Sequence, residues 1–257
     1  GALSPGVAIP LASQAGAITA DNGVVSAGGL SLEVGSIRAS WQGDPDTGLG
    51  RTDFRVEDIH YPASAIRRSD PSGVVLALIG GGDLIFDLWG MAVMTAEGGT
   101  FDSALSARSL GKFRVSGRFA GRSSDVVASA PIYSQSDAVV PSPQLGPMTV
   151  SRLSVRFEDQ SITGKILAML AAERSVGPEM IIEEAAAAVE QALASVRNTR
   201  LIEQIRTAVK TYLADPKSLT LTAEGAPPAP ARAVIEQAIA DPASLLAQFP
   251  VSVSAND

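Results

Sequence analysis

The chain has 257 residues, a formal net charge of −7 and no cysteine, and 46% of its residues are hydrophobic. That hydrophobic content excludes an intrinsically disordered protein, and the acidic balance argues against a protein that coats nucleic acid, which needs a basic excess. The lack of cysteine excludes disulfides and thiolate metal sites, and the single histidine, His60, excludes multi-histidine metal sites.

From about Ile18 to Phe157, hydrophobic residues recur at every second position, which is typical of β-strands. At four places this pattern shifts, so that the apolar residues on either side of the shift are three apart. The pairs are Val34 and Ile37, Val56 and Ile59, Leu88 and Met91, and Val150 and Leu153. Four β-bulges would predict a strongly curved sheet or an open barrel, and a tight turn at each shift is the alternative.

The connections between these strands carry glycine and proline. Gly80–Gly82 lies between the apolar runs Val74–Ile79 and Leu84–Leu88, which predicts a hairpin of two strands. Gly98 and Gly99 predict a further turn. The stretch 134–147, which contains three prolines and little periodicity, predicts a long surface connection.

After Asp159 the hydrophobic period changes to 3.6, which predicts helices. A first helix follows Ile162, and Gly177-Pro178 begins an Ala-rich second helix. Asn198 is placed to cap a third helix, which ends at Asp215-Pro216. Two strands, 218–224 and 251–253, then return the chain to a sheet, with a short helix expected around 234–239.

Together these patterns predict an α+β fold. The N-terminal half is expected to form a curved antiparallel β-sheet or open barrel, and the C-terminal half a helical layer with a strand-helix-strand ending. Residues 1–160 form the predicted β-rich region and residues 161–257 the predicted helical region with two late strands. We expect the two regions to pack as one continuous domain.

No group of residues has the arrangement of an active site. The chain lacks the G-x-S-x-G elbow of serine hydrolases, and the only histidine, His60, lies inside a predicted strand. Asp44, Asp46 and Asp53 lack the acids that a calcium loop needs at its fifth and twelfth positions, which favours a turn between strands. We therefore expect a protein that is not an enzyme and that uses no cofactor and no metal.

One predicted strand has a basic face. Lys112, Arg114, Arg118 and Arg122 occupy alternate positions, and Phe113, Val115 and Phe119 occupy the opposite face. Such a strand has either an ordinary solvated face or a surface for anionic lipid headgroups. These four basic residues are the candidate ligand-binding residues of the chain.

The segment LSVRFEDQSITGKILAMLAAERSVGPEM, followed by DPKSLTLTAEG and VSVSAND, resembles envelope proteins of Gram-negative and especially alphaproteobacterial origin. More distantly, it is similar to the AsmA-like group. The resemblance covers the chain from Met148 onward. It implies export to the periplasm and a role in lipid handling or envelope maintenance, and it supplies no functional residues.

Two functions follow from these expectations. The first is a periplasmic protein that binds an apolar ligand, such as a lipid, between the sheet and the Ala-rich helices. The small side chains of the alanines at 185–188, Ala192 and Ala194 would leave space there. The second is an envelope scaffold or protein-interaction module without a ligand. The expected partners are a lipid or membrane surface, or another envelope protein, and no nucleic acid. A lipid binder should have an apolar cavity of at least a few hundred Å³, whereas a scaffold should be solidly packed.

Overall fold

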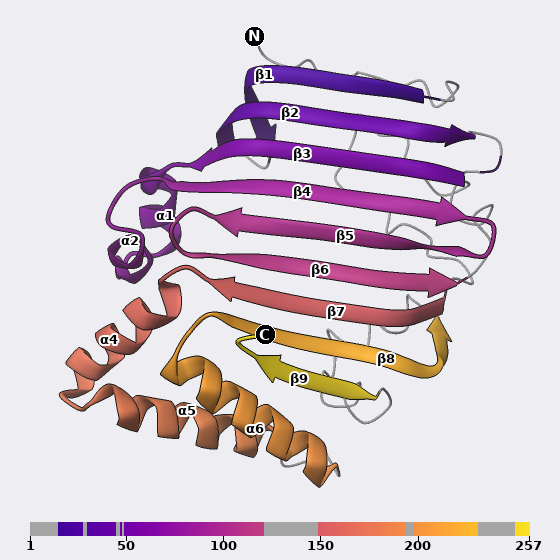
Figure 1. Cartoon of the computed structure of the whole chain (residues 1–257). Helices are drawn as coiled ribbons and strands as arrows, with labels where there is room; N and C mark the ends of the chain where they lie inside the picture. The colour runs from indigo at the N-terminus through magenta and orange to yellow at the C-terminus, as the bar shows by residue number, and fades with distance from the viewer. Residues whose placement is uncertain are drawn as a thin grey trace.

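The computed structural model describes residues 15–27, 30–44, 47, 49–120, 149–193, 198–230 and 250–257. In this part of the chain, nine strands form one sheet in chain order, and each strand is antiparallel to the next (Figure 1). The strands are β1 (Ala15–Ala27), β2 (Leu30–Asp44), β3 (Leu49–Tyr61), β4 (Leu84–Thr95), β5 (Gly98–Ala107), β6 (Gly111–Ala120), β7 (Thr149–Asp159), β8 (Ser218–Pro230) and β9 (Val251–Ala255). The sheet is curved and unclosed, with β1 and β9 at its edges, so the predicted α+β fold with an antiparallel sheet is confirmed.

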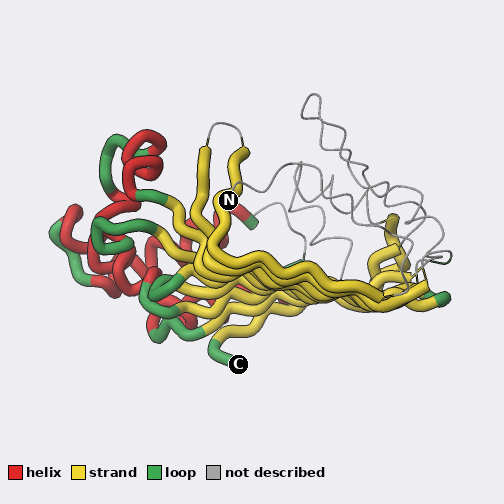
Figure 2. The backbone as a smooth tube through the Cα atoms, turned by 90° about the horizontal axis from the view of Figure 1, so that it is seen from above, coloured by secondary structure: helices red, strands yellow, loops and turns green. Residues whose placement is uncertain are grey.

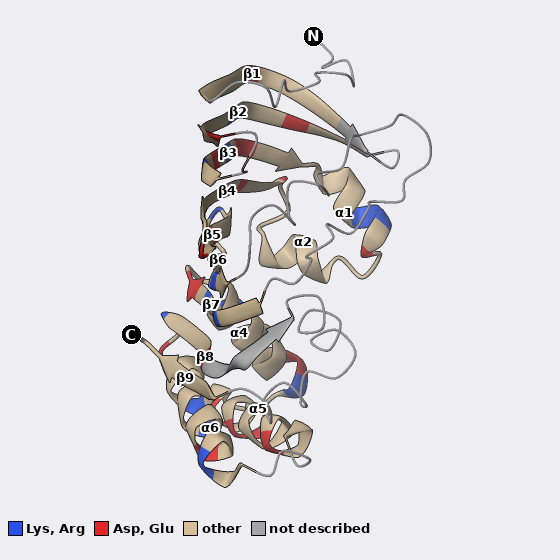
Figure 3. Ribbon diagram, turned by 90° about the vertical axis from the view of Figure 1, so that its right-hand side faces the viewer, with Lys and Arg blue, Asp and Glu red and all other residues tan. Residues whose placement is uncertain are grey.

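The helices occupy the connections of this sheet. They are α1 (Ala63–Ser69), α2 (Val74–Leu78), α4 (Ile162–Arg174), α5 (Pro178–Ala192) and α6 (Thr199–Ala214). Seen edge-on, α1, α2 and α4 lie on one side of the sheet (Figure 3). Of the connections predicted from sequence, the stretch 134–147 and the helix around 234–239 lie outside the described residues.

Bulges absorb three of the four shifts in the strand pattern. The β3–β4 register shifts between Val56 and Ile59, where Asp58 has a φ of 53°. In β2, Gly35 lies opposite Asp58, and neither takes part in the pairing, so β2 and β3 bend together. The ends of strands near the N-terminus accordingly turn out of the plane of the sheet (Figure 2). Because each bulge takes up one residue, the apolar side chains before and after it stay on the same face.

The two remaining shifts have different outcomes. The β7–β8 register shifts between Val150 and Arg152, which keeps Val150 and Leu153 on one face. At Leu88 and Met91, by contrast, the β4–β5 register is continuous. Leu88 and Met91 therefore point to opposite faces, and β4 carries apolar side chains on both of them.

The predicted hairpin at Gly80–Gly82 is wrong, because Val74–Leu78 forms helix α2 rather than a strand. The Asp70 carboxylate accepts a hydrogen bond from the Val75 backbone N–H at 2.8 Å, and Leu76 is buried. The glycines end this helix: Gly80 and Gly81 both have a φ of 81°, and the Gly81 N–H donates to the Leu76 carbonyl at 2.7 Å. A short apolar run fits a strand or a helix equally well by periodicity, and here the flanking caps decide.

The three C-terminal helices form as predicted. Gly177 precedes Pro178 at the start of α5, and the Asn198 side chain accepts a hydrogen bond from Leu201 N–H at 3.1 Å to cap α6. Helix α6 packs on the sheet, where Leu201 and Ile205 form a buried cluster with Val251 and Val253 of β9. The Ala-rich helix α5 packs on α4 and α6. Within the described residues, no helix has both the length and the apolar character needed to cross a membrane.

Candidate functional site

The sheet separates phenylalanine from arginine. We use the strand register to assign each strand residue to a face, since directly paired residues share one face and successive residues alternate. One face, which we call the apolar face, holds every phenylalanine of the described strands: Phe54, Phe86, Phe101, Phe113, Phe119 and Phe157. The other, which we call the polar face, holds every arginine of those strands: Arg38, Arg51, Arg55, Arg114, Arg118, Arg152 and Arg156.

An unbroken apolar row crosses the apolar face from β2 to β8. Its members lie directly opposite one another on neighbouring strands: Ile37, Val56, Leu88, Leu105, Phe113, Phe157 and Leu219. A row of this length needs the apolar positions of seven strands to be in register. It gives the sheet one continuous hydrophobic surface rather than separate patches.

Aromatic rings on the apolar face lie over glycines of the next strand. A Cβ atom on Gly90 would lie 2.3 Å from the Phe54 ring, and one on Gly117 would lie 2.4 Å from the Phe101 ring. Trp41 covers Gly16 in the same way, at 2.1 Å. Because the rings fill the places where side chains would otherwise stand, they lie low on the sheet and shield the glycine backbone.

Helix α6 covers the apolar face at β7–β9. Tyr212 of α6 contacts Phe157 edge to face, with ring centroids 6.4 Å apart. Its hydroxyl donates to Asp159 Oδ2 at 3.2 Å and is bonded to Thr163 Oγ1. Burial raises the pKa of Tyr212 to about 12, and the neighbouring Asp159 carboxylate acts in the same direction.

Away from α6 the apolar face is much more open. In the described structure, Phe54, Leu105 and Phe113 are 39%, 42% and 46% exposed, which is high for large hydrophobic side chains on a sheet. All three lie on β3, β5 and β6, beyond the strands that α6 contacts. The uncovered part of the apolar face is the first candidate binding surface.

The polar face brings arginines directly opposite each other. Register pairs Arg38 with Arg55, Arg114 with Arg156, and Arg118 with Arg152. Like charges directly opposite on neighbouring strands are destabilising unless counter-charges offset them. Each of the three pairs therefore needs nearby negative charge to offset the repulsion.

Acidic side chains compensate part of this repulsion. Arg114 donates from Nε to Asp102 at 2.8 Å, and its guanidinium lies 5.8 Å from the Trp89 ring centroid. Arg156 forms an ion pair with Asp257 at 2.6 Å. Partial burial acts to raise the pKa of Asp257, but hydrogen bonds from Ser254, Arg156 and Thr220 outweigh it and lower the pKa to about 2.

The predicted ligand-binding residues share one face, as far as the structure describes them. Lys112, Arg114 and Arg118 all lie on the polar face, and Arg122 lies outside the described residues. Lys112 is paired with Glu158 at 3.8 Å and Arg114 with Asp102, whereas no described acid lies within ion-pair distance of Arg118. These residues lie behind the apolar face, so one lipid bound flat on that face does not reach them with its headgroup.

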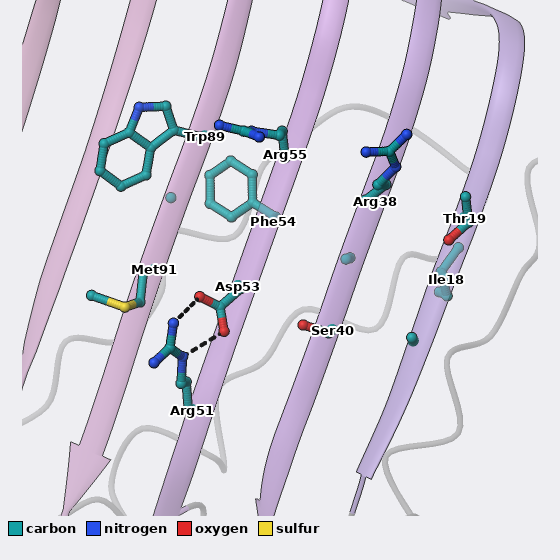
Figure 4. A pocket seen from close by; sticks show the side chains of 13 residues that line it. Ile18, Thr19, Arg38, Ser40, Arg51, Asp53, Phe54, Arg55, Trp89 and Met91 are labelled. Carbon is teal, nitrogen blue, oxygen red and sulfur yellow. Dashed lines mark hydrogen bonds and ion pairs between the residues drawn. The ribbon is translucent and has the colours of Figure 1, made fainter.

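Sequence reasoning missed a hollow of about 530 Å³ on the polar face of β1–β4 (Figure 4). Arg38, Arg55 and Trp89 line one part of it, and Arg51 and Asp53 line another. Arg51 donates two hydrogen bonds of 2.7 Å to Asp53, which lower the pKa of that carboxyl. The alternation of arginine, aspartate and arginine along β3 was a usable signal, but Trp89 is brought in only by the register of β4.

Two further hollows are described. One of about 580 Å³ adjoins the first beside Gln42, and one of about 420 Å³ lies between α6 and β9, beside Thr207 and Val253. None of the three is an apolar cavity between the sheet and the Ala-rich helix α5. Among the described residues, no group of His, Asp and Glu is arranged to hold a metal ion.

No curated protein sequence matches the chain. Residues 104–256, more than half of the chain, match the model of a family described as "Uncharacterized protein". The match spans β6 to β9 and α4 to α6, and it does not bear on the resemblance to AsmA-like envelope proteins, which stays a prediction. The chain therefore belongs to this family of proteins described as "Uncharacterized protein".

Proposed function

We propose that this protein is a non-enzymatic, periplasmic lipid-binding protein that holds an acyl chain against the apolar face of its sheet. The observation that carries the proposal is the apolar row across β2–β8, which α6 covers only at its C-terminal end. A periplasmic location is part of the proposal because of the sequence resemblance to Gram-negative envelope proteins. Fractionation of cells that carry the full-length gene tests it, and protein found only in the cytosol would contradict it.

An acyl chain suits this surface in size and in shape. A strand of ten residues is about 33 Å long and neighbouring strands are about 4.8 Å apart, so the face accommodates an extended chain along or across the strands. The aromatic rings that lie over Gly90 and Gly117 pack close to the sheet, so they protrude less from the apolar face. Each methylene taken out of water contributes about 0.8 kcal/mol, so a long chain gains enough from a flat surface to bind.

The second candidate, an envelope scaffold that binds another protein, is favoured by one specific observation. None of the three described hollows lies between the sheet and the Ala-rich helix α5, whereas Phe54, Leu105 and Phe113 are exposed on the outside of the sheet. Exposed apolar patches of this kind also occur at protein–protein interfaces. Lipid binding is preferred here because two of these exposed residues, Leu105 and Phe113, belong to the apolar row that crosses seven strands.

Native mass spectrometry of protein purified from its own host tests the proposal. We expect a discrete added mass corresponding to one lipid. Changing Leu105 and Phe113 together to Ser, which alters two directly paired residues of the uncovered face, should remove that mass. The matched control, Thr100→Gln, changes an exposed residue on the polar face of β5, the strand that carries Leu105. This variant should keep the added mass.

The outcomes separate the two candidates. Wild-type protein without any added mass, or equal lipid in all three proteins, contradicts the lipid proposal. A chemical cross-link from the uncovered face to a second protein in intact cells, together with no bound lipid, supports the scaffold. The thermal unfolding midpoint of each variant shows whether a lost mass reflects lost binding or a lost fold.

A further inference from the structure

The hollow on the polar face of β1–β4 has the features of an anion site. Arg38 and Arg55 lie directly opposite each other on β2 and β3, and their side chains are 57% and 58% exposed. Among the described residues, their only ion-pair partner is Glu57, with nitrogen–oxygen distances of 3.9 and 3.5 Å. One carboxylate is thus shared by two guanidinium groups.

The guanidinium donors of this pair are largely unused within the described structure. The distances to Glu57 are those of an ion pair and not of a close hydrogen bond. Glu57 itself accepts a hydrogen bond of 3.0 Å from Ser36, which holds it in the row beside the arginines. Two planar guanidinium forks therefore point N–H groups toward the hollow or the solvent, with one negative charge between them.

The rest of the hollow is neutral or apolar. Arg51 and Asp53 neutralise each other through two hydrogen bonds, so they add shape and polarity but little net charge. Trp89 is the direct partner of Arg55 on β4, and Met91 is the direct partner of Asp53. The two side chains form an apolar wall, and both face the hollow (Figure 4).

We propose that this hollow binds a phosphate monoester, with the phosphate between Arg38 and Arg55 and the organic part against Trp89 and Met91. A phosphate monoester offers three strong acceptor oxygens and about −1.5 to −2 charges at pH 7, so each guanidinium fork can bind two of the oxygens, one of which is shared by the two forks. Bound phosphate would offset the repulsion between the opposed arginines. The ester is either a free molecule or the headgroup of phosphatidic acid, a phospholipid whose phosphate is itself a monoester, since both present the same group.

The inference is independent of the acyl-chain proposal, because the hollow and the apolar face lie on opposite sides of the sheet. The chain also provides a local reporter. Its two tryptophans are Trp41 on the apolar face and Trp89 in the hollow, so a Trp41→Phe variant emits from Trp89 alone.

The test titrates this single-tryptophan protein with phenyl phosphate and, separately, with vesicles of phosphatidylcholine with or without phosphatidic acid. We expect a saturable change in Trp89 fluorescence in at least one arm. Phenyl phosphate alone identifies a free ester as the ligand, and phosphatidic acid alone identifies a headgroup. The further changes Arg38→Gln and Arg55→Gln together should weaken binding about tenfold or more.

The matched control changes Arg67 and Arg68 to Gln, two exposed basic residues in the last turn of α1. It removes the same charge far from the hollow and should keep the affinity of the parent within about twofold, because exposed charges beyond a Debye length are screened. The proposal is overturned if neither arm gives a saturable change. It is overturned equally if the control weakens binding as much as the Arg38 and Arg55 variant.

Discussion

The two faces of the sheet are built from the same strands and have opposite chemistry. On the apolar face, neighbouring residues such as Leu105 and Phe113 attract each other and gain stability from anything apolar that covers them. On the polar face, neighbours such as Arg38 and Arg55 repel each other and gain stability from negative charge. The two faces therefore have different chemical requirements, apolar cover on one and negative charge on the other.

The apolar face is covered by a helix at one end and exposed in its middle. At β9, helix α6 buries Leu201 and Ile205 against Val251 and Val253, and the face serves there as a protein core. On β5 and β6 the same face leaves Leu105 and Phe113 more than 40% exposed. The part of the apolar face under α6 therefore belongs to the protein core, whereas the part on β5 and β6 is exposed within the described structure.

The largest effect is expected where the apolar face is covered. Leu201 is only 2% exposed, so Leu201→Ala should lower the free energy of unfolding by about 3 kcal/mol through lost burial and a residual cavity. Chemical denaturation measures the change. The control Gln204→Ala, at an exposed position of the same helix, should change it by less than about 0.5 kcal/mol. A small effect of Leu201→Ala would mean that α6 does not complete the core.

A smaller loss is expected where a ring lies on a glycine. In Gly90→Ala the new methyl group would lie 2.3 Å from the Phe54 ring, so the ring must move and the free energy of unfolding should fall by about 2 kcal/mol. The control Gly164→Ala adds a methyl group in open space within α4 and should raise stability by about 0.5 to 1 kcal/mol. If both variants behave alike, the rings do not rest on the glycines.

Much of this architecture was predictable, and the limits have physical causes. The two faces of β6 can be identified from sequence, because strand periodicity is local information. Basic residues occupy one set of alternate positions, from Lys112 to Arg118, and apolar residues occupy the other set, from Phe113 to Phe119. The pairing of Phe54 with Gly90 depends on the register of two strands separated by two helices, which no local pattern contains. Helix α2 was missed because its end depends on the left-handed Gly80 and Gly81, which a hairpin would use equally well.

The candidate sites were less predictable than the fold. The basic face of β6 could be read from sequence, but its partners could not, since Asp102 and Trp89 come from other strands. The hollow around Arg38 and Arg55 needs the register of β2, β3 and β4 at once. Local spacing carries no information on such a convergence.

The polar face should respond to charge removal in binding more than in stability. Changing Lys112, Arg114 and Arg118 together to Gln should weaken binding to anionic vesicles by about 1 to 2 kcal/mol at low salt. The loss is less than the usual ~1 kcal/mol per basic residue because Lys112 and Arg114 already have acidic partners. Co-sedimentation measures it, and equal binding by the variant and wild type would leave these residues as a solvated face.

The smallest expected effect is the pH response of the β7–β9 edge of the polar face. Because the pKa of Asp257 lies near 2, below its ordinary 3.8, its ionised form stabilises the fold above about pH 4. This contribution should disappear as the pH falls from about 4 through about 2. The difference in unfolding free energy between wild type and Asp257→Asn should therefore shrink over that range. A difference that does not vary with pH would mean that the ion pair with Arg156 contributes nothing.

The two tryptophans, one on each face, can show directly whether an acyl chain binds the apolar face. Trp89→Phe leaves Trp41 on the apolar face, and Trp41→Phe leaves Trp89 on the polar face. Each single-tryptophan protein is titrated with a fatty acid that carries a nitroxide quencher on its acyl chain. If the chain binds the apolar face, the fluorescence of Trp41 should fall saturably while that of Trp89 changes little. Equal quenching of both tryptophans, quenching of Trp89 alone, or no saturable quenching of Trp41 would contradict the claim.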